Sequence, residues 1–285
     1  MLARVCAAAK ERSLSPSVLT FNPHPRVFFA DQTRQPDKAP MAINGLRDRL
    51  SLLRQYGIEQ ITLLKFNLAL ANMTPKIFVE TLLIEQLKTR WLLVGHDFRF
   101  GHKRSGDIDL LMYYAQRGDF ELSTIDDVDD AHGQRISSSS VRETLIRGDV
   151  DEAKFLLGHP YSISGHVIHG QKLGRTLGFP TLNLAVTPNC SARIGIYVVR
   201  VHGLAQQPMM GVASLGLRPT VTDTGRLLLE VHLIDSSLDA YGKLVCVEFL
   251  KFLRGEEKFP DLQTLTQAMQ HDTLQARQYF ADDGL

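Results

Sequence analysis

The chain has 285 residues, of which 44% are hydrophobic and 22% are charged, and its formal net charge is +1. This composition is ordinary for a globular protein and gives no support to a general nucleic-acid binder or a polybasic membrane surface. No apolar run approaches the roughly 20 residues that cross a bilayer, the N-terminus lacks a signal-peptide layout, and the three cysteines lie too far apart for a zinc or disulfide framework, so we expect a cytoplasmic protein.

The first half of the sequence alternates helical and strand patterns, beginning with an amphipathic helix over residues 1–12. Short buried apolar runs predict strands, and apolar residues that recur at helical spacing predict helices. The predicted strands are 17–21, 60–64 and 91–95, and the predicted helices are 46–56, 74–87, 107–117, 141–147 and 149–157. Strands that alternate with helices favour a parallel, doubly wound sheet.

From Tyr161 onward the sequence is rich in short strands without intervening helices, which favours a small barrel or sandwich. A final helix is predicted over about residues 261–279. The helix-breaking tripeptide Gly-His-Pro at residues 158–160 marks the change, so we expect one domain over 1–157 and a second over 158–285. The strands predicted in the second domain are 163–169, 181–184, 197–201, 212–215, 227–234 and 244–252.

The most informative segment runs from Gly165 to Leu184 and reads G-H-V-I-H-G-Q-K-L-G-R-T-L-G-F-P-T-L-N-L. Its glycines leave backbone amides open to close approach, which suits phosphate oxygens. The segment is not a Walker A loop, because Gly170-x-x-x-Gly174-Arg175-Thr176 has one residue too few and an arginine in place of the lysine. The glycines alone are explained equally well by a flexible hairpin.

Polar residues within the predicted strands are the next candidates. Thr181 and Asn183 alternate on a strand and point to one face, where their oxygens suit a Mg²⁺ ion that also binds ATP, although a capped strand end is the alternative. Glu230 lies in the apolar run L-L-L-E-V-H-L, where a carboxylate acts as a general base or forms an edge salt bridge. Arg218 and Arg254 are candidates for binding flavin or phosphate, with solvated charged turns as the alternative.

The first half carries motifs at places where α/β proteins bind ligands. Pro23 and His24, in F-N-P-H-P, follow the first strand, and Asp97, in V-G-H-D-F-R-F-G, follows the third. The run I-S-S-S-S-V-R begins a helix, so Ser139 and Arg142 lie where free amides and hydroxyls suit a phosphate. Taken singly, a stiff turn and plain helix capping explain these residues as well.

The second half resembles the bacterial riboflavin kinase module from about residue 160 to 280. The shared motifs are G-x-V-x-H-G-x-x-L-G-R-T-L-G-F-P-T-x-N-L, G-I-Y, G-x-R-P-T, L-E-V-H-L, Y-G-K and L-R-x-E-x-K-F. The resemblance implies a small antiparallel β-barrel with a C-terminal helix, Mg²⁺ bound by Thr181 with Asn183 beside it, and activation of the riboflavin 5′-hydroxyl by Glu230. The residues implied to hold the ATP phosphates are Gly170, Lys172, Gly174, Arg175, Thr176 and Gly178. The loop at 235–241 departs from the family pattern.

The first half resembles the FMN adenylyltransferase module of bifunctional FAD synthetases, which belongs to the nucleotidyltransferase superfamily. The resemblance implies an α/β Rossmann-like domain that adenylylates FMN to FAD. The implied nucleotide and flavin contacts are Pro23, His24, Asp97, Ser139 and Arg142. His96 stands where the family has an acidic residue, and Ser139 stands where it has a threonine.

The family's opening strand and loop, G-x-F-D-G-x-H-x-G-H, has no counterpart in this sequence. Because its histidines bind ATP phosphates in the family, the resemblance implies a first domain that is incomplete at its N-terminus, with absent or severely impaired adenylyltransferase activity. Two alternatives follow. The protein is a bifunctional enzyme acting on riboflavin, FMN and ATP with Mg²⁺, or it is a riboflavin kinase whose first domain is a scaffold. A flavin- or nucleotide-binding protein without turnover fits less well, because the predicted base and metal ligands are present. Neither nucleic acid nor a membrane is expected as a partner, and the oligomeric state stays open.

Overall fold

The computed structural model describes residues 1–126, 135–170, 178–218, 226–236 and 238–282. They divide into two compact units. The first comprises Met1–Pro40 and Leu50–Arg135, and the second comprises Met41–Arg49 and Ile136–Leu285. The boundary expected at residue 158 follows the change in motifs, and it stays a prediction of where the two functions divide.

The first unit contains two parallel strand pairs. Strand β1 (Ser17–Asn22) pairs with β2 (Gln60–Lys65), and β3 (Trp91–Gly95) pairs with β4 (Glu121–Ile125). The three predicted strands and their parallel pairing are confirmed. Among the described residues, however, the strands form two separate pairs rather than one continuous sheet. Strand β4 was not predicted, because its E-L-S-T-I sequence has only two strongly apolar residues.

Helices pack on these strands through an apolar core that includes Val79, Val94, Leu111 and Tyr114. The predicted helix over 74–87 is observed as α5 followed without a break by a π-helical segment. Helix α2 was not predicted, although Pro25 at its first turn and the His24 side chain that caps it are ordinary start signals. The helices of this unit are α1 (Leu2–Glu11), α2 (Pro25–Gln32), η1 (Pro36–Lys38), α4 (Leu68–Ala71), α5 (Pro75–Ile77), η2 (Phe78–Gln86), η3 (His102–Arg104) and α6 (Ile108–Gln116), and α3 (Leu46–Gln55) has residues in both units.

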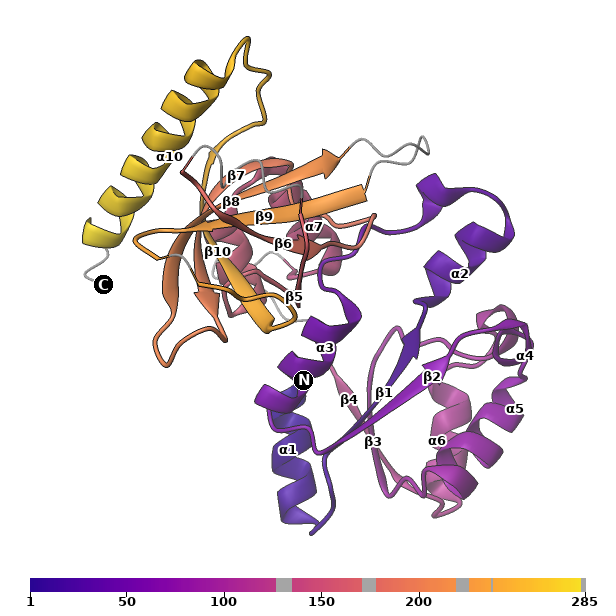
Figure 1. Ribbon diagram of the computed structural model, residues 1–285. Helices are drawn as coiled ribbons and strands as arrows, with labels where there is room; N and C mark the ends of the chain where they lie inside the picture. The colour runs from indigo at the N-terminus through magenta and orange to yellow at the C-terminus, as the bar shows by residue number, and fades with distance from the viewer. Residues whose placement is uncertain (127–134, 171–177, 219–225, 237, 283–285) are drawn as a thin grey trace. The chain divides into compact units, whose positions relative to one another are not determined.

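The second unit is built on a closed barrel of antiparallel strands in the order β10-β5-β6-β9-β8-β7 (Figure 1). All six predicted strands are confirmed. Their bounds are β5 (Ser162–Ile168), β6 (Thr181–Ala185), β7 (Gly195–His202), β8 (Met209–Arg218), β9 (Arg226–Leu233) and β10 (Leu244–Arg254). Alternate residues of each strand fill the barrel, as Leu229, Val231, Leu215 and Val247 do, and all four are fully buried.

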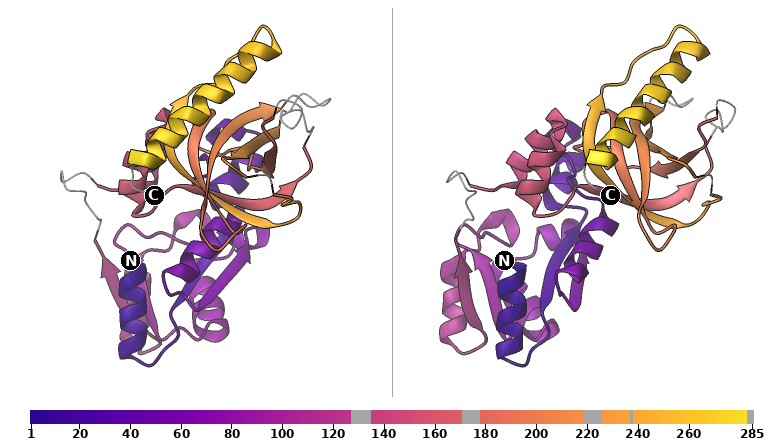
Figure 2. Two further views of the ribbon diagram at one scale, coloured as in Figure 1. Left: turned by 60° about the vertical axis from the view of Figure 1, so that its left-hand side comes forward. Right: turned by 90° about the vertical axis from the view of Figure 1, so that its left-hand side faces the viewer.

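Helices α7, α8 and α10 pack against the barrel. Helix α7 (Ser138–Arg147) opens with a capping box between Ser137 and Ser140, and α8 (Val150–Leu157) follows it directly. Both helices contribute buried residues to the barrel core. The C-terminal helix α10 (Leu262–Asp282) lies along the outside of the barrel in both views of Figure 2.

Helix α10 is attached to the barrel by an apolar contact and by two ion pairs. Ala276 and Phe280 pack on outward-facing side chains of the strands, such as Val198. Asp272, which is only 2% exposed, accepts two hydrogen bonds from the Arg254 guanidinium, at 2.9 and 2.7 Å. The second pair, between Arg277 and Asp235, is exposed on both sides.

These two ion pairs predict different responses to mutation. Asp272→Ala leaves the Arg254 guanidinium partly buried without its partner, and we expect it to lower the free energy of unfolding of the barrel by about 3–5 kcal/mol. Arg277→Ala, the matched control on the same helix, breaks an exposed pair and should change that free energy by less than about 1 kcal/mol. Hydrogen exchange of the 262–282 amides measures both. Equal losses of protection in the two variants would contradict the larger contribution assigned to the Arg254–Asp272 pair.

Candidate functional site

The register of the barrel brings Asn183, Glu230 and Ser214 side by side. Strand β9 lies between β6 and β8, so that Glu230 stands opposite Asn183 on one side and opposite Ser214 on the other. Directly opposed residues of antiparallel strands lie on the same face, with Cα atoms about 4.5–5.5 Å apart. Since Leu229 and Val231 point into the core, this row faces outward. We call Asn183, Glu230 and Ser214 the polar row.

Asn183 is buried in an unusual way for an amide. Its side chain is 4% exposed, and its Nδ2 donates to the Thr181 carbonyl over 3.4 Å, while its Oδ1 has no hydrogen-bond partner among the described residues. The backbone of Gly170 lies directly on the amide, because a Cβ built at this glycine would be 2.6 Å from Oδ1. A buried oxygen without a donor costs about 1–3 kcal/mol, and a cation is one group that would remove that cost.

Thr181 lies two residues before Asn183, so both point to one side of β6. It lines a small pocket of about 30 Å³ together with Pro180, Asp239 and Tyr241. The Tyr241 ring lies against the imidazole of His169, the residue after β5, with centroids 4.0 Å apart and the ring planes inclined by 33°. The pocket therefore lies between the start of β6 and residues 238–241.

The structure places only some of the residues predicted to bind phosphate. Gly170 and Gly178 are described, and Gly178 has a positive φ of 85°, which glycine adopts without strain. Arg218 ends β8, where its cross-strand partner is a second arginine, Arg226. The predicted residues that lie outside the described ones are Lys172, Gly174, Arg175 and Thr176.

Arg254 makes structural contacts in this fold. Beyond its pair with Asp272, it donates to the Gly255 carbonyl and lies over the Phe259 ring, 5.6 Å from the ring centroid. These contacts connect the end of β10 to the segment before helix α10. Its predicted part in flavin or phosphate binding stays a prediction.

In the first unit, Pro23 and His24 follow β1 as predicted, joined to the strand by a cis Asn22–Pro23 peptide. The Nδ1 of His24 accepts a hydrogen bond from the Arg26 backbone amide at 3.2 Å, which fixes the ring at the start of α2. Asp97 follows β3, is exposed, and lies 3.8 Å from the Arg135 guanidinium.

An aromatic cluster beside these residues was missed in the sequence. The rings of Phe21, Phe28 and Phe29 all meet the Phe66 ring edge to face, with centroids 5.3–5.8 Å apart. Phe29 is 50% exposed, so part of its ring is accessible to solvent. The only signal in the sequence was the F-F pair that follows P-H-P-R-V, because Phe66 lies far along the chain.

Ser139 and Arg142 belong to the second unit, in helix α7. Ser139 is exposed in the first turn of the helix. Arg142 donates to the Met41 carbonyl at 2.6 Å and to the Ser138 carbonyl at 3.0 Å. Both residues lie in the first turns of a helix, as the sequence predicted. Their joint role with residues of the first unit stays a prediction.

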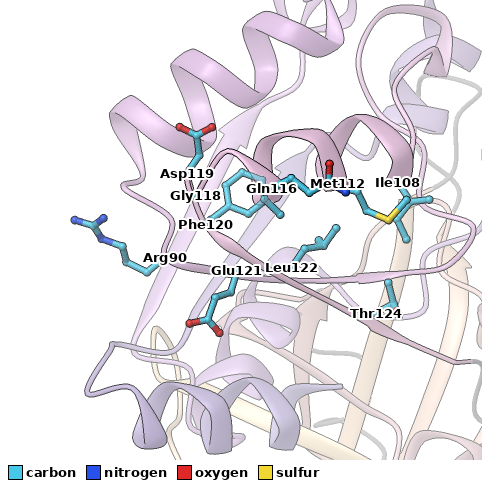
Figure 3. Close-up of a pocket in the computed structure, with 11 residues that line it drawn as sticks. Arg90, Ile108, Met112, Gln116, Gly118, Asp119, Phe120, Glu121, Leu122 and Thr124 are labelled. Carbon is cyan, nitrogen blue, oxygen red and sulfur yellow. The ribbon is translucent and has the colours of Figure 1, made fainter.

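A larger pocket of about 870 Å³ lies in the first unit between α6 and β4 (Figure 3). Ile108 and Met112 of the helix and Leu122 and Thr124 of the strand form its walls. None of the residues that the motifs singled out lines it. Among the helices of the described residues, none combines the length and apolar character that a membrane span requires.

Comparisons with known proteins match both halves of the chain. A family model described as riboflavin kinase matches residues 157–280, and one described as FAD synthetase matches residues 1–140. The bifunctional riboflavin kinase/FMN adenylyltransferase of Escherichia coli (strain K12) is 39% identical over 271 residues, which are 95% of this chain and 84% of that protein. The protein of the same name from Haemophilus influenzae is 36% identical over 95% of this chain and 86% of its own length.

A solved structure is similar over nearly the whole chain. It is described as a macrolide-efflux protein from Streptococcus pneumoniae, with a TM-score of 0.78 and 31% sequence identity. The match covers 97% of this chain and 88% of that one. The similarity therefore extends through both units.

Proposed function

The chain belongs to the family of bifunctional riboflavin kinases/FMN adenylyltransferases, and we propose that the polar row of its barrel is the kinase site. The family carries out two ATP-dependent reactions, the phosphorylation of riboflavin to FMN and the adenylylation of FMN to FAD, and this chain has the domains for both. The observation that carries the proposed site is the buried Asn183 oxygen, which lacks a donor among the described residues and lies beside Glu230.

Glu230 is proposed as the general base. It accepts the proton of the riboflavin 5′-hydroxyl while the hydroxyl oxygen bonds to the γ-phosphorus of ATP. The bond from that phosphorus to the bridging oxygen breaks, and ADP leaves. Phosphoryl transfer depends mainly on alignment and charge stabilisation, so one positioned carboxylate is a sufficient protein contribution to proton transfer.

Thr181 and Asn183 are proposed to hold Mg²⁺. Hydroxyl and amide oxygens are ligands of the kind this ion takes, and the buried Asn183 Oδ1 fits such a ligand because no described donor satisfies it. Bound there, Mg²⁺ would supply positive charge to the ATP phosphates. The chain itself holds the amide in place, since Gly170 packs on it and its Nδ2 donates to the Thr181 carbonyl.

The glycine-rich segment between β5 and β6 is proposed to cover the ATP phosphates. Support comes from the family model that matches residues 157–280 and from the position of Gly170 against the proposed metal ligand. Arg218 and Arg254 are proposed to assist in binding flavin or phosphate. The residues proposed to hold phosphate are Gly170, Lys172, Gly174, Arg175, Thr176 and Gly178.

For the second reaction we propose a site that uses Phe29 in addition to the predicted residues, because its exposed ring offers a surface for the flavin ring system. No observation favours the alternative in which only the kinase is active, and that alternative stays a prediction. The predicted residues of this site are Pro23, His24, Asp97, Ser139 and Arg142.

A cytoplasmic location is part of the proposal. All three cysteines, Cys6, Cys190 and Cys246, are free thiols, which suits a reducing compartment. Riboflavin, FMN and ATP are the proposed small-molecule partners.

Glu230→Gln tests the general base. The variant keeps the shape of the side chain but cannot take a proton, so FMN formation should fall roughly 10²- to 10⁴-fold while riboflavin still binds. Chromatography measures FMN, and quenching of riboflavin fluorescence measures binding. Glu248→Gln, on strand β10 near His202, is the control and should keep its activity. Unchanged turnover in Glu230→Gln would remove this residue from the role of base.

Substitutions at Asn183 and Thr181 test the metal ligands. Asn183→Leu and Thr181→Val keep the approximate shapes but lose the oxygens, so the Mg²⁺ concentration for half-maximal FMN formation should rise roughly tenfold or more. Thr181→Ser keeps the hydroxyl and should stay near the wild type. A chelator should stop the reaction, and added Mg²⁺ should restore it. An unaltered Mg²⁺ requirement in both variants would rule out the assignment.

Phe29→Ala tests the second site. Purified protein is supplied with FMN and ATP, and FAD is measured by chromatography. Loss of an aromatic contact should weaken FAD formation roughly 2- to 10-fold and leave FMN formation from riboflavin unchanged. Leu68→Ala, which removes another exposed apolar side chain of the same unit, is the control. If the wild type makes FMN but no FAD, the kinase-only alternative holds.

A further inference from the structure

A second carboxylate lies on the same side of the barrel as the polar row. Glu256, in the segment between β10 and α10, places its carboxylate directly over the Cα of Gly216 on strand β8. A Cβ built at Gly216 would overlap the carboxylate and would lie 2.8 Å from its Cδ. A residue with a side chain at position 216 would therefore displace this carboxylate.

The strand register relates Glu256 to the proposed base. Gly216 follows Ser214 by two residues on β8, so both face the same side and lie about 7 Å apart along the strand. Ser214 is directly opposite Glu230. The Glu256 carboxylate is thus on the same outer face as Glu230, one strand repeat farther along β8.

The electrostatic environment agrees with this placement. Partial burial and then the nearby charge of Glu230 raise the pKa of the Glu256 carboxyl. Among the described residues, Glu256 forms no hydrogen bond and no ion pair. Arg254, two residues before it in the chain, donates two hydrogen bonds to Asp272. Two carboxylates that share a site repel each other, and a ligand that donates hydrogen bonds to Glu256 relieves part of that repulsion.

We propose that Glu256 is a substrate-binding residue of the kinase site, which accepts hydrogen bonds from secondary hydroxyls of the ribityl chain. This inference rests on the proposed function, because it assumes that the terminal hydroxyl of the same chain lies at Glu230. The ribityl chain carries a row of hydroxyl groups that can donate hydrogen bonds. It is long enough to extend from Glu230 along β8 toward Gly216. The buried Asn183 oxygen, without a donor among the described residues, independently indicates that ligands occupy this face.

In this role, Glu256 makes the site specific for flavins whose side chain carries secondary hydroxyls. A site that offers a carboxylate to a hydroxyl discriminates strongly against an analogue that lacks the hydroxyl, because the carboxylate is then left desolvated without a donor. A flavin whose side chain carries only the terminal hydroxyl should therefore be a poorer substrate than riboflavin for the wild-type protein. The same difference should disappear when the carboxylate is removed.

The experiment compares riboflavin with its 10-(5-hydroxypentyl) analogue, which has the same ring system and terminal hydroxyl but no secondary hydroxyls. Glu256→Ala should lower kcat/KM for riboflavin roughly 10- to 100-fold, the loss expected for hydrogen bonds to a charged group. For the analogue, the variant and the wild type should agree within about twofold. Equilibrium binding of each flavin, measured by fluorescence, should show the same pattern. Glu257→Gln, the adjacent exposed carboxylate, is the control and should match the wild type for both flavins.

Gly216→Ala provides a second variant that leaves Glu256 in place. Its methyl group meets only the far end of a flexible side chain, so it should move the carboxylate without disrupting the strand. It should reproduce the loss for riboflavin, and the double variant should lose no more than either single one. An equal loss for both flavins, or no loss for riboflavin, would overturn the role of Glu256. A wild-type protein that makes no FMN would instead refute the kinase site itself.

Discussion

The closure of the barrel is the constraint on which the rest of the second unit depends. Once six strands close in a fixed order, the register of β9 against β6 and β8 is set, and Glu230 has to stand between Asn183 and Ser214. A shift of one residue in that register would turn Glu230 into the core and Leu229 outward. The apolar side chains inside the barrel therefore fix the position of the proposed kinase site on its outer face.

Two glycines leave room for polar groups of the proposed site because they have no side chain. Gly170 and Gly216 each lie where a side chain would occupy the place of a functional group, the Asn183 amide in one case and the Glu256 carboxylate in the other. The segment that carries Glu256 is held at one end by Arg254, which is bound to Asp272 of helix α10. The C-terminal helix thus helps to position a segment of the proposed site, although none of its own side chains belongs to the polar row.

Much of this architecture could be predicted from the sequence. Alternation placed Thr181 and Asn183 on one face of a strand and separated Glu230 from its buried neighbours, because a strand has a period of two residues. The alignment of Glu230 with Ser214 could not be predicted, since it depends on which strands become neighbours when the barrel closes. Arg254 was predicted as a ligand contact, whereas its bond to Asp272 depends on how α10 packs. Strand β4 was missed because its sequence is too polar to stand out.

The two units differ in whether their strands are hydrogen-bonded to neighbours on one side or on both. In the second unit every barrel strand has a hydrogen-bonded neighbour on both sides, so the barrel has no edge strand. In the first unit each of the four described strands has a ladder partner on one side only. The barrel therefore offers no free edge to a further strand, whereas each described strand of the first unit does.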